Sequence, residues 1–242
     1  MSAARIERLV TSGTFSLDGG TWDVENNVWV VGNDDEVIVI DPAHDAAAVA
    51  AFVGERQVVA VLLTHGHDDH IRAARETAEL IGAELFLNPA DHELWSAVYD
   101  ELPDREIADG DVFSVAGVAL TARHTPGHSP GSTSFVAPAL EAVFTGDTLF
   151  NGGPGATGRS YSDFPTIIES ISTSLLTLPP ETTVYTGHGD TTTIGAEAPH
   201  LEEGIARGHE PRAAGRSASL SCSQSVRILS ASVRSMPKRA TA

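Results

Sequence analysis

Cysteine and lysine are almost absent from the 242 residues, which contain one of each, Cys222 and Lys238. A single cysteine excludes an intrachain disulfide framework and suits a reducing compartment. No apolar run approaches the roughly 20 residues that a membrane-spanning helix needs. The N-terminus carries Arg5, Glu7 and Arg8 where a secretory signal would need an apolar stretch. We therefore expect a cytoplasmic protein without a membrane partner.

Basic residues are also scarce through most of the chain. Residues 1–210 hold nine arginines against all 33 acidic residues, a net charge of −24, whereas residues 211–242 hold six basic residues and no acid. Such an acidic body repels a phosphate backbone, so we expect a small-molecule substrate and no nucleic-acid partner. The oligomeric state stays open.

Composition predicts one folded domain, because 41% hydrophobic residues suffice for a single core. We place this domain at residues 1–210. The basic, Ser/Ala/Arg-rich stretch 211–242 lacks a sustained apolar period, and we predict that it is a disordered tail.

Apolar periodicity and turn residues predict alternating strands and helices. Strands are expected at 27–31, 36–41, 58–64, 85–88, 111–115, 118–123, 132–136, 142–145 and 183–186. Helices are expected at 45–53, 69–81, 91–99, 165–176 and 199–207. Two groups of strands, each accompanied by helices, indicate an α/β protein.

The most informative stretch is Thr-His-Gly-His-Asp-Asp-His at residues 64–70, directly after the apolar run 58–63. Polar groups at the mouth of a buried strand are costly unless a cation holds them. Imidazole and carboxylate are ligands that zinc, iron and manganese accept. The four candidate ligands here are His65, His67, Asp69 and His70.

Matching residues recur downstream, which disfavours the simpler interpretation of a solvated histidine-rich turn. His128, Asp147 and His188 each follow an apolar run, and each comes directly after a glycine. Glycine lets the backbone turn sharply and approach an ion closely. Together with residues 64–70, these three turns predict a metal site.

In this order, the residues resemble the motifs of the metallo-β-lactamase fold superfamily, and the resemblance runs from about residue 28 to about residue 208. Within the superfamily, the chain is most similar to thioester hydrolases of the glyoxalase II (hydroxyacylglutathione hydrolase) type. The segment 146–150, followed by a glycine-rich loop and Gly158-Arg159, carries this closer likeness. The resemblance implies a four-layer αββα sandwich.

The resemblance also implies two divalent metal ions, most readily zinc, with iron or manganese as alternatives. The implied ligands are His65, His67 and His128 for one ion, Asp69, His70 and His188 for the other, and Asp147 between both. Two-metal sites hold their ions about 3.5–4 Å apart, which suits a shared hydroxide.

Three further residues receive roles from the resemblance. Asp41 is expected to orient a ligand histidine, although it could equally be a helix N-cap. Arg159 and Tyr161 occupy positions where relatives bring a cation and an aromatic ring to a thiol conjugate; ordinary surface roles are the alternative. Among the other histidines, His44 and His124 are near enough to the motifs to line a cleft.

These residues suggest hydrolysis by a metal-bound hydroxide, because a bound metal lowers the pKa of water from 15.7 to about 7. We expect this hydroxide to attack the thioester of a low-molecular-weight thiol, with Asp69 and Asp147 as the catalytic residues among the ligands. Glutathione itself is in question, since only about twenty residues separate Gly189 from the tail, too few for the family's glutathione-binding helices. A sugar thiol such as mycothiol is an alternative.

Other functions stay open at this stage. A mononuclear iron persulfide dioxygenase would use the positions of His65, His128 and Asp147, all present here. A lactonase of the same fold is a further alternative. A structural or sensory metal centre is disfavoured, because structural zinc is usually closed by four ligands and often uses cysteine. Asp147 argues against antibiotic hydrolysis, since β-lactamases of this fold usually lack it.

Overall fold

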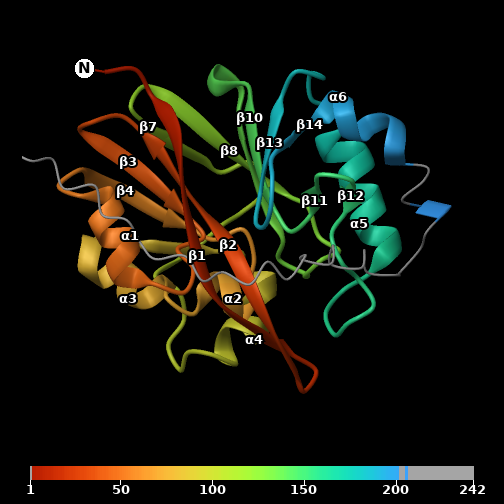
Figure 1. The fold of residues 1–242 in the computed structure, drawn as a ribbon, viewed down its shortest axis with the longest axis horizontal. Helices are drawn as coiled ribbons and strands as arrows, with labels where there is room; N and C mark the ends of the chain where they lie inside the picture. Colours follow the sequence, from red (N-terminus) through yellow and green to blue (C-terminus); the bar gives the residue numbers. More distant parts are fainter. Residues whose placement is uncertain (1, 202–204, 207–242) are drawn as a thin grey trace, which may run out of the picture. The chain divides into compact units, whose positions relative to one another are not determined.

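The structure, a computed structural model, describes residues 2–201, 205 and 206. Within these residues, the strands form two six-stranded sheets and a two-stranded ribbon (Figure 1). The first sheet has the order β1 (Arg5–Leu17), β2 (Gly20–Gly32), β3 (Glu36–Ile40), β4 (Gln57–Leu62), β5 (Leu85–Leu87), β6 (Arg105–Glu106). The second has the order β14 (Thr192–Thr193), β13 (Thr183–Thr186), β10 (Ala142–Gly146), β9 (Thr133–Ala137), β8 (Val118–His124), β7 (Val112–Val115). The ribbon pairs β11 (Leu149–Phe150) with β12 (Gly153–Pro154).

Helices cover the outer face of each sheet (Figure 1). The first sheet carries α1 (Ala46–Val53), α2 (Asp68–Ile71), α3 (Ala74–Ile81), the 3-10 turn η1 (Pro89–Asp91) and α4 (His92–Ser96). The second carries α5 (Phe164–Ser170), the π-helical turn η3 (Ile171–Leu175), α6 (Ile194–Glu197) and the 3-10 turn η4 (Ala198–His200). The short turn η2 (Pro138–Leu140) connects β9 to β10.

The period-two alternation of the central strands divides the core into three layers of side chains. On β2, Val30 faces the helices of the first sheet, whereas Val31 faces the second sheet. On β10, Phe144 faces the first sheet, whereas Val143 faces α5. Because successive side chains of a strand point to opposite faces, both faces of each central strand are buried. The predicted four-layer αββα sandwich is confirmed.

Strand direction brings the turns after several strands to the same edge. β3 and β4 are parallel, and so are β10 and β13. β8 and β10 both run antiparallel to β9, so they share one direction. Backbone hydrogen bonds then join the two sheets at this edge: Thr133 donates to Thr64 at 2.7 Å, and Asn27 donates to Gly187 at 2.8 Å.

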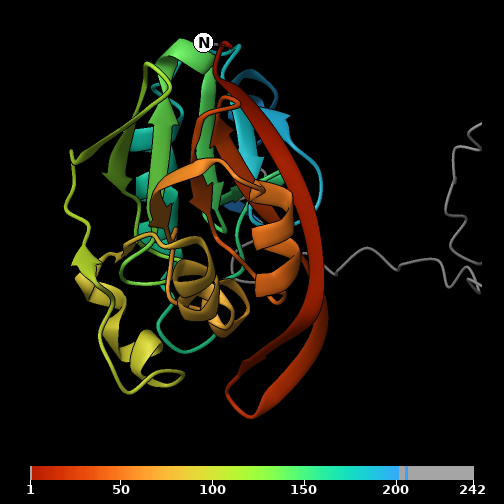
Figure 2. The ribbon, with the colours of Figure 1, turned by 90° about the vertical axis from the view of Figure 1, so that its left-hand side faces the viewer.

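The largest departure from the predicted elements is an N-terminal hairpin. β1 and β2 pair along their whole length, from Arg5↔Gly32 to Leu17↔Gly20, whereas no strand was predicted before residue 27. The hairpin, red in Figure 2, extends past the other strands. Most of its side chains are exposed or half-buried, so it leaves little hydrophobic pattern in the sequence.

The predicted helix 69–81 is wrong as a single element. It is broken into α2 and α3, with Ala73 at φ −98° and ψ 0° between them. The break lets Asp69 and His70 be buried at the end of β4 while Ala74 and Ala78 pack on the first sheet. Residues 165–176 likewise begin as α5 and end as a π-helical turn.

Two predictions lie wholly or partly outside the described residues. These are the disordered tail 211–242, with its boundary near residue 210, and part of the predicted helix 199–207, of which residues 202–204 and 207 are not described. Among the described residues, no helix is both long and apolar enough to cross a bilayer.

Candidate metal centre

All seven predicted ligands converge at the edge where the two sheets meet. They form three groups whose candidate ligand atoms lie within 4.8 Å of one another: His65 with His67 and His128; His65 with His70 and Asp147; and Asp69 with His70 and His188. His65, His67, Asp69 and His70 follow β4, His128 follows β8, Asp147 follows β10 and His188 follows β13.

Asp147 lies between the two predicted sets of ligands. Its Oδ2 is 3.6 Å from His128 Nε2 and 3.3 Å from His188 Nε2, and its Oδ1 is 3.4 Å from His70 Nε2. Asp69 Oδ2 lies 3.3 Å from His188 Nε2. One carboxylate therefore reaches imidazoles from three different loops, a geometry that suits a bridge between two ions.

Asp41 lies beside the cluster and accepts three hydrogen bonds. Its Oδ1 accepts from the Thr64 amide at 2.8 Å, and its Oδ2 accepts from the Thr64 hydroxyl at 2.7 Å and from His70 Nδ1 at 3.1 Å. The Thr64 oxygen lies 3.0 Å from His65 Nδ1, so it can accept that proton. Asp41 thus turns the Nε2 atom of His70 toward the cluster directly and that of His65 through Thr64. It does not cap α1, which Asp45 does.

Backbone carbonyls orient two more imidazoles. His128 Nδ1 lies 2.9 Å from the oxygen of Ala156, and His188 Nδ1 lies 2.7 Å from the oxygen of Glu25. Because a carbonyl oxygen can only accept, each Nδ1 must carry the proton and donate. When such a ring is neutral, its Nε2 atom carries the lone pair that can bind a cation.

Unpartnered atoms within the cluster test whether these residues fit a metal. His65 Nε2, His67 Nε2 and Asp147 Oδ1 are buried and make no hydrogen bond of good geometry with any other described residue. His67 Nδ1 lies 2.9 Å from His128 Nε2 and can donate to it, which leaves Nε2 as the bare nitrogen of the His67 ring. Buried polar atoms are normally satisfied, because leaving them bare is costly. The donor set therefore fits a cation.

The charges of the cluster favour the same conclusion. Burial opposes a positive charge on His70 and His188, but Asp69 and Asp147 outweigh it. The pKa of His70 is raised well above its ordinary value, and that of His188 is raised to about 10. Burial also opposes ionisation of both carboxyls, but the two histidines outweigh it and hold the pKa of Asp69 and of Asp147 below the usual range. This part of the cluster thus attracts positive charge.

The three-histidine side of the cluster behaves differently. Burial lowers the pKa of His67 to about 3, and the nearby His128 adds to this effect. Burial and the neighbouring imidazoles also hold the pKa of His65 well below its ordinary value. Both rings are therefore neutral at pH 7, the form in which an imidazole binds a metal.

Asn26, a buried residue of β2, was not predicted to belong to the site. Its Nδ2 donates to Asp69 Oδ2 at 3.0 Å, and its Oδ1 lies 2.8 Å from His44 Nε2. Asn26 therefore fixes one carboxylate of the cluster, and His44 supports Asn26 rather than the cluster itself. The only signal in the sequence is the polar pair Asn26-Asn27 ahead of an apolar strand.

Arg159 lies beside the hairpin, close to one side of the cluster. Its guanidinium is 3.8 Å from the ring centroid of Trp22 and 5.7 Å from that of Phe15. The Phe15 ring in turn makes an edge contact with His67, with centroids 5.3 Å apart. Trp22 is 40% exposed, so this aromatic wall is open to a ligand. Tyr161 points elsewhere and donates to Glu93 on α4 at 3.0 Å.

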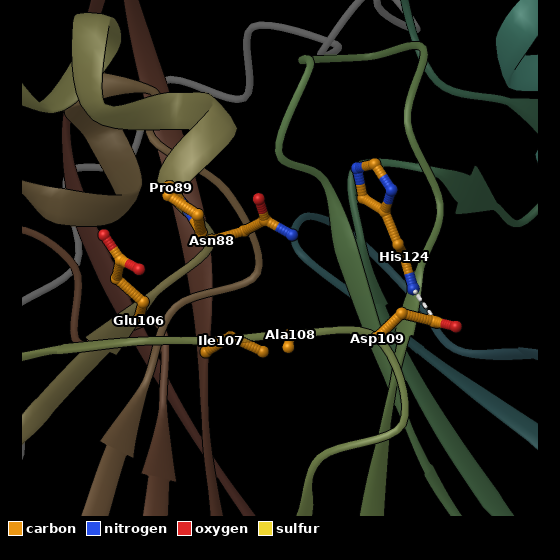
Figure 3. A pocket seen from close by; sticks show the side chains of 7 residues that line it. All are labelled: Asn88, Pro89, Glu106, Ile107, Ala108, Asp109 and His124. Carbon is orange, nitrogen blue, oxygen red and sulfur yellow. Dashed lines mark hydrogen bonds between the residues drawn. The ribbon is translucent and has the colours of Figure 1, made fainter.

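His124 lines a separate cavity, which Figure 3 shows. The residues around this cavity are Asn88, Pro89, Glu106, Ile107, Ala108, Asp109 and His124. None of the seven cluster residues lines it, and the His124 ring lies 2.8 Å from the carbonyl oxygen of Pro130. The expectation that His124 lines the cleft of the metal cluster has no support in these contacts.

The arrangement defines a protein class. A His/Asp cluster at the edge of an αββα sandwich, with several Nε2 atoms turned inward, is a set of residues that can hold a metal ion. The family model of the metallo-beta-lactamase superfamily matches residues 21–188. The chain therefore belongs to the metallo-β-lactamase superfamily, a class of metal-dependent hydrolases.

Two relatives share most of their length with the chain. The hydroxyacylglutathione hydrolase GloC of Haemophilus influenzae is 33% identical over 192 residues, which cover 73% of this chain and 86% of that protein. The probable metallo-hydrolase YqgX of Bacillus subtilis is 30% identical over 203 residues, which cover 72% of this chain and 90% of that protein.

Solved structures show the same fold. TTHA1623, crystallised in a di-iron-bound form, has a TM-score of 0.65 and is 30% identical, covering 78% of this chain and 96% of its own. The B3 metallo-β-lactamase BLEG-1 has a TM-score of 0.67 and is 27% identical, covering 79% of this chain and 98% of its own.

Proposed function

We propose that the chain is a dinuclear metal-dependent hydrolase that cleaves the thioester of a low-molecular-weight thiol, as glyoxalase II does, in the cytoplasm. The observation that carries the dinuclear part is the position of Asp147 between imidazoles of both sets. The relationship to GloC of Haemophilus influenzae, a hydroxyacylglutathione hydrolase, supports the thioester class.

The ligand assignment uses two of the three groups of the cluster, the one with three histidines and the one that contains Asp69 and His188. One ion is assigned to His65, His67 and His128, the other to Asp69, His70 and His188, and Asp147 is shared. Zinc suits this nitrogen and oxygen donor set. Iron is the leading alternative, because TTHA1623 was crystallised with two iron ions.

When bound, the divalent ions supply a water of lowered pKa and a Lewis acid for the thioester carbonyl. The residues of the chain position that chemistry. Asp41 and Thr64 hold the rings of His70 and His65, and Asn26 holds the carboxylate of Asp69. No side-chain nucleophile has to act, and we assign catalytic roles only to Asp69 and Asp147, as ligands that hold the reacting water.

The surface formed by Phe15, Trp22 and Arg159, which we call the hairpin wall, is proposed to bind the thiol part of a small-molecule substrate. Phe15 contacts His67, so a group lying on Phe15 and Trp22 would be adjacent to the three-histidine set. Arg159 adds a positive charge at that wall, which suits a carboxylate or hydroxyl of the conjugate. Tyr161 is proposed to contribute at the outer rim, where it is 41% exposed.

Metal content and substrate scope together test the proposal. Elemental analysis of the purified chain is expected to find two divalent ions per chain. Hydrolysis of S-lactoylglutathione would be compared with that of a mycothiol thioester, and turnover of one of them is expected. A single iron with oxygen uptake on glutathione persulfide would overturn the proposal in favour of a persulfide dioxygenase. Selective opening of acyl-homoserine lactones would instead indicate a lactonase.

A variant separates the dinuclear mechanism from a mononuclear one. Asp69→Ala is expected to lower kcat/KM by more than about 100-fold, because it removes a ligand of the second ion and the partner of Asn26. Glu79→Ala, an exposed acidic residue on α3, is the matched control and is expected to behave like the parent protein. Unchanged turnover in Asp69→Ala would refute the dinuclear mechanism.

A further inference from the structure

Asp91 is a fully buried carboxylate outside the seven proposed ligands, with 0% exposure. It ends the turn η1, directly after β5 of the first sheet. Asp91 occupies the N-cap position of α4, yet its side chain makes no capping hydrogen bond there. An ionisable side chain buried in this way needs partners elsewhere.

Those partners belong to two different ligand loops. Asp91 Oδ2 accepts from the Gly66 amide at 2.8 Å and from the Ser129 hydroxyl at 2.6 Å. Asp91 Oδ1 accepts from the Gly131 amide at 2.6 Å. Gly66 stands between His65 and His67 in the chain, and Ser129 directly follows His128. The hydrogen bonds of Asp91 therefore hold residues that are adjacent in the chain to His65, His67 and His128, the three histidines of one proposed ligand set.

Close packing around Asp91 leaves little room for either loop to move. A Cβ added at Gly66 would lie 3.0 Å from the Asp91 Cβ, and one added at Gly131 would lie 2.7 Å from its Cγ. At Gly131 this approach excludes a Cβ unless Asp91 shifts, and at Gly66 a Cβ would fit only tightly. The two loops come from opposite sheets, after β4 and after β8, so Asp91 joins the two halves of the site.

We propose that Asp91 is a positioning residue that sets the spacing of the three-histidine metal subsite (His65, His67 and His128). This inference rests on the proposed metal centre. Asp91 has no hydrogen bond to Asp69, His70 or His188 among the described residues, and these residues are held by Asn26, Asp41 and the Glu25 carbonyl instead. Loss of Asp91 should therefore weaken one subsite and spare the other.

Asp91→Asn is the sharpest perturbation, because it keeps the shape of the side chain. The carboxylate uses both oxygens as acceptors, whereas asparagine has one acceptor and a donating amide. One backbone or hydroxyl donor is then left facing an N–H group, which opposes the observed packing. Asp104→Asn is the matched control: Asp104 accepts from the Leu85 amide at 2.9 Å and pairs with Arg75, but touches neither ligand loop.

The experiment is a zinc titration of the full-length protein against a chromophoric chelator, with unfolding followed by circular dichroism. The parent protein and Asp104→Asn are expected to bind two ions per chain. Asp91→Asn is expected to bind one ion as the parent does and the other about 10- to 100-fold more weakly. If Asp91 were merely structural, Asp91→Asn would lower the free energy of unfolding without weakening one zinc ion more than the other.

If the parent binds fewer than two divalent ions, the proposed dinuclear centre fails. If the parent binds two and Asp91→Asn binds both as tightly, or loses both equally while remaining folded, the inference fails and the metal centre stands. Should Asp91→Asn not fold, Ser129→Ala removes only one of the three bonds. It is expected to weaken the same subsite to a smaller degree, and unchanged binding would overturn the inference.

Discussion

Metal binding should release protons from the cluster, and the number follows from its charges. In metal-free protein near pH 6.5, His188 has a pKa of about 10 and His70 a pKa well above its ordinary value, so both carry a proton. His65 and His67 are already neutral, and the carboxyls are already ionised. An imidazole must lose its proton to bind a metal at Nε2. Filling the site is therefore expected to release about two protons from His70 and His188, besides any proton lost by a metal-bound water.

Isothermal titration of metal-free protein with zinc, at pH 6.5 in two buffers of different ionisation enthalpy, measures this release directly. His188→Gln is the control and should lower the release by about one proton, because it removes one of the two protonated rings. Binding without proton release in the parent protein would refute the charge assignment of the cluster.

The same protonation makes the stability of the metal-free protein depend on pH. The pKa of His188 is higher in the folded protein than its unfolded value of 6.5. Its contribution to the free energy of unfolding is therefore complete below pH 6.5. It is lost as pH rises to about 10. A shift from 6.5 to about 10 corresponds to a loss on the order of 5 kcal/mol of unfolding free energy. Urea unfolding at pH 6.5 and 9.5 measures the larger part of this loss; equal stability at the two pH values would contradict the assignment.

Three further outcomes are expected. Asp41→Asn should weaken metal retention by about 10- to 100-fold, measured by chelator competition, because it disturbs the ring of a ligand histidine and the loop that follows β4. Phe144→Ala should cost about 3–5 kcal/mol in urea unfolding, since this ring is fully buried between the sheets, whereas Val112→Ala, at 59% exposure, should change stability by less than about 0.5 kcal/mol. Trp22→Ala and Arg159→Ala should raise KM in steady-state kinetics and leave the metal content unchanged in elemental analysis. A loss of metal would instead show that the hairpin wall supports the cluster.

Much of the centre could be predicted from local sequence. The motif at residues 64–70 places four polar residues at the end of an apolar strand, and His128, Asp147 and His188 repeat that setting. The structure brings all seven together, since parallel strands place their following turns at one edge. The resemblance to the superfamily, rather than this pattern, assigned Asp41 as an orienting residue, and its bond to His70 Nδ1 has that geometry.

The supporting residues could not be predicted in this way. Asn26 lies 43 positions from Asp69, and Asp91 lies 38 positions from Ser129, so neither pairing has a local pattern. Asp91 looked like an ordinary helix start, because a carboxylate after Asn-Pro-Ala is typical of one. The wall of Phe15, Trp22 and Arg159 depends on a hairpin whose half-exposed residues carry no clear periodicity.

Local sequence determined the alternation of strands and helices and the identity of the candidate ligands, because apolar periodicity and strand-end polarity are properties of neighbouring residues. The four layers of the sandwich were implied by the resemblance to the superfamily. Only the tertiary structure decided how those ligands are oriented and which side chains hold them. Hydrogen-bond direction, burial and the pKa shifts of the cluster depend on residues that are distant in the chain and meet only after both sheets have packed.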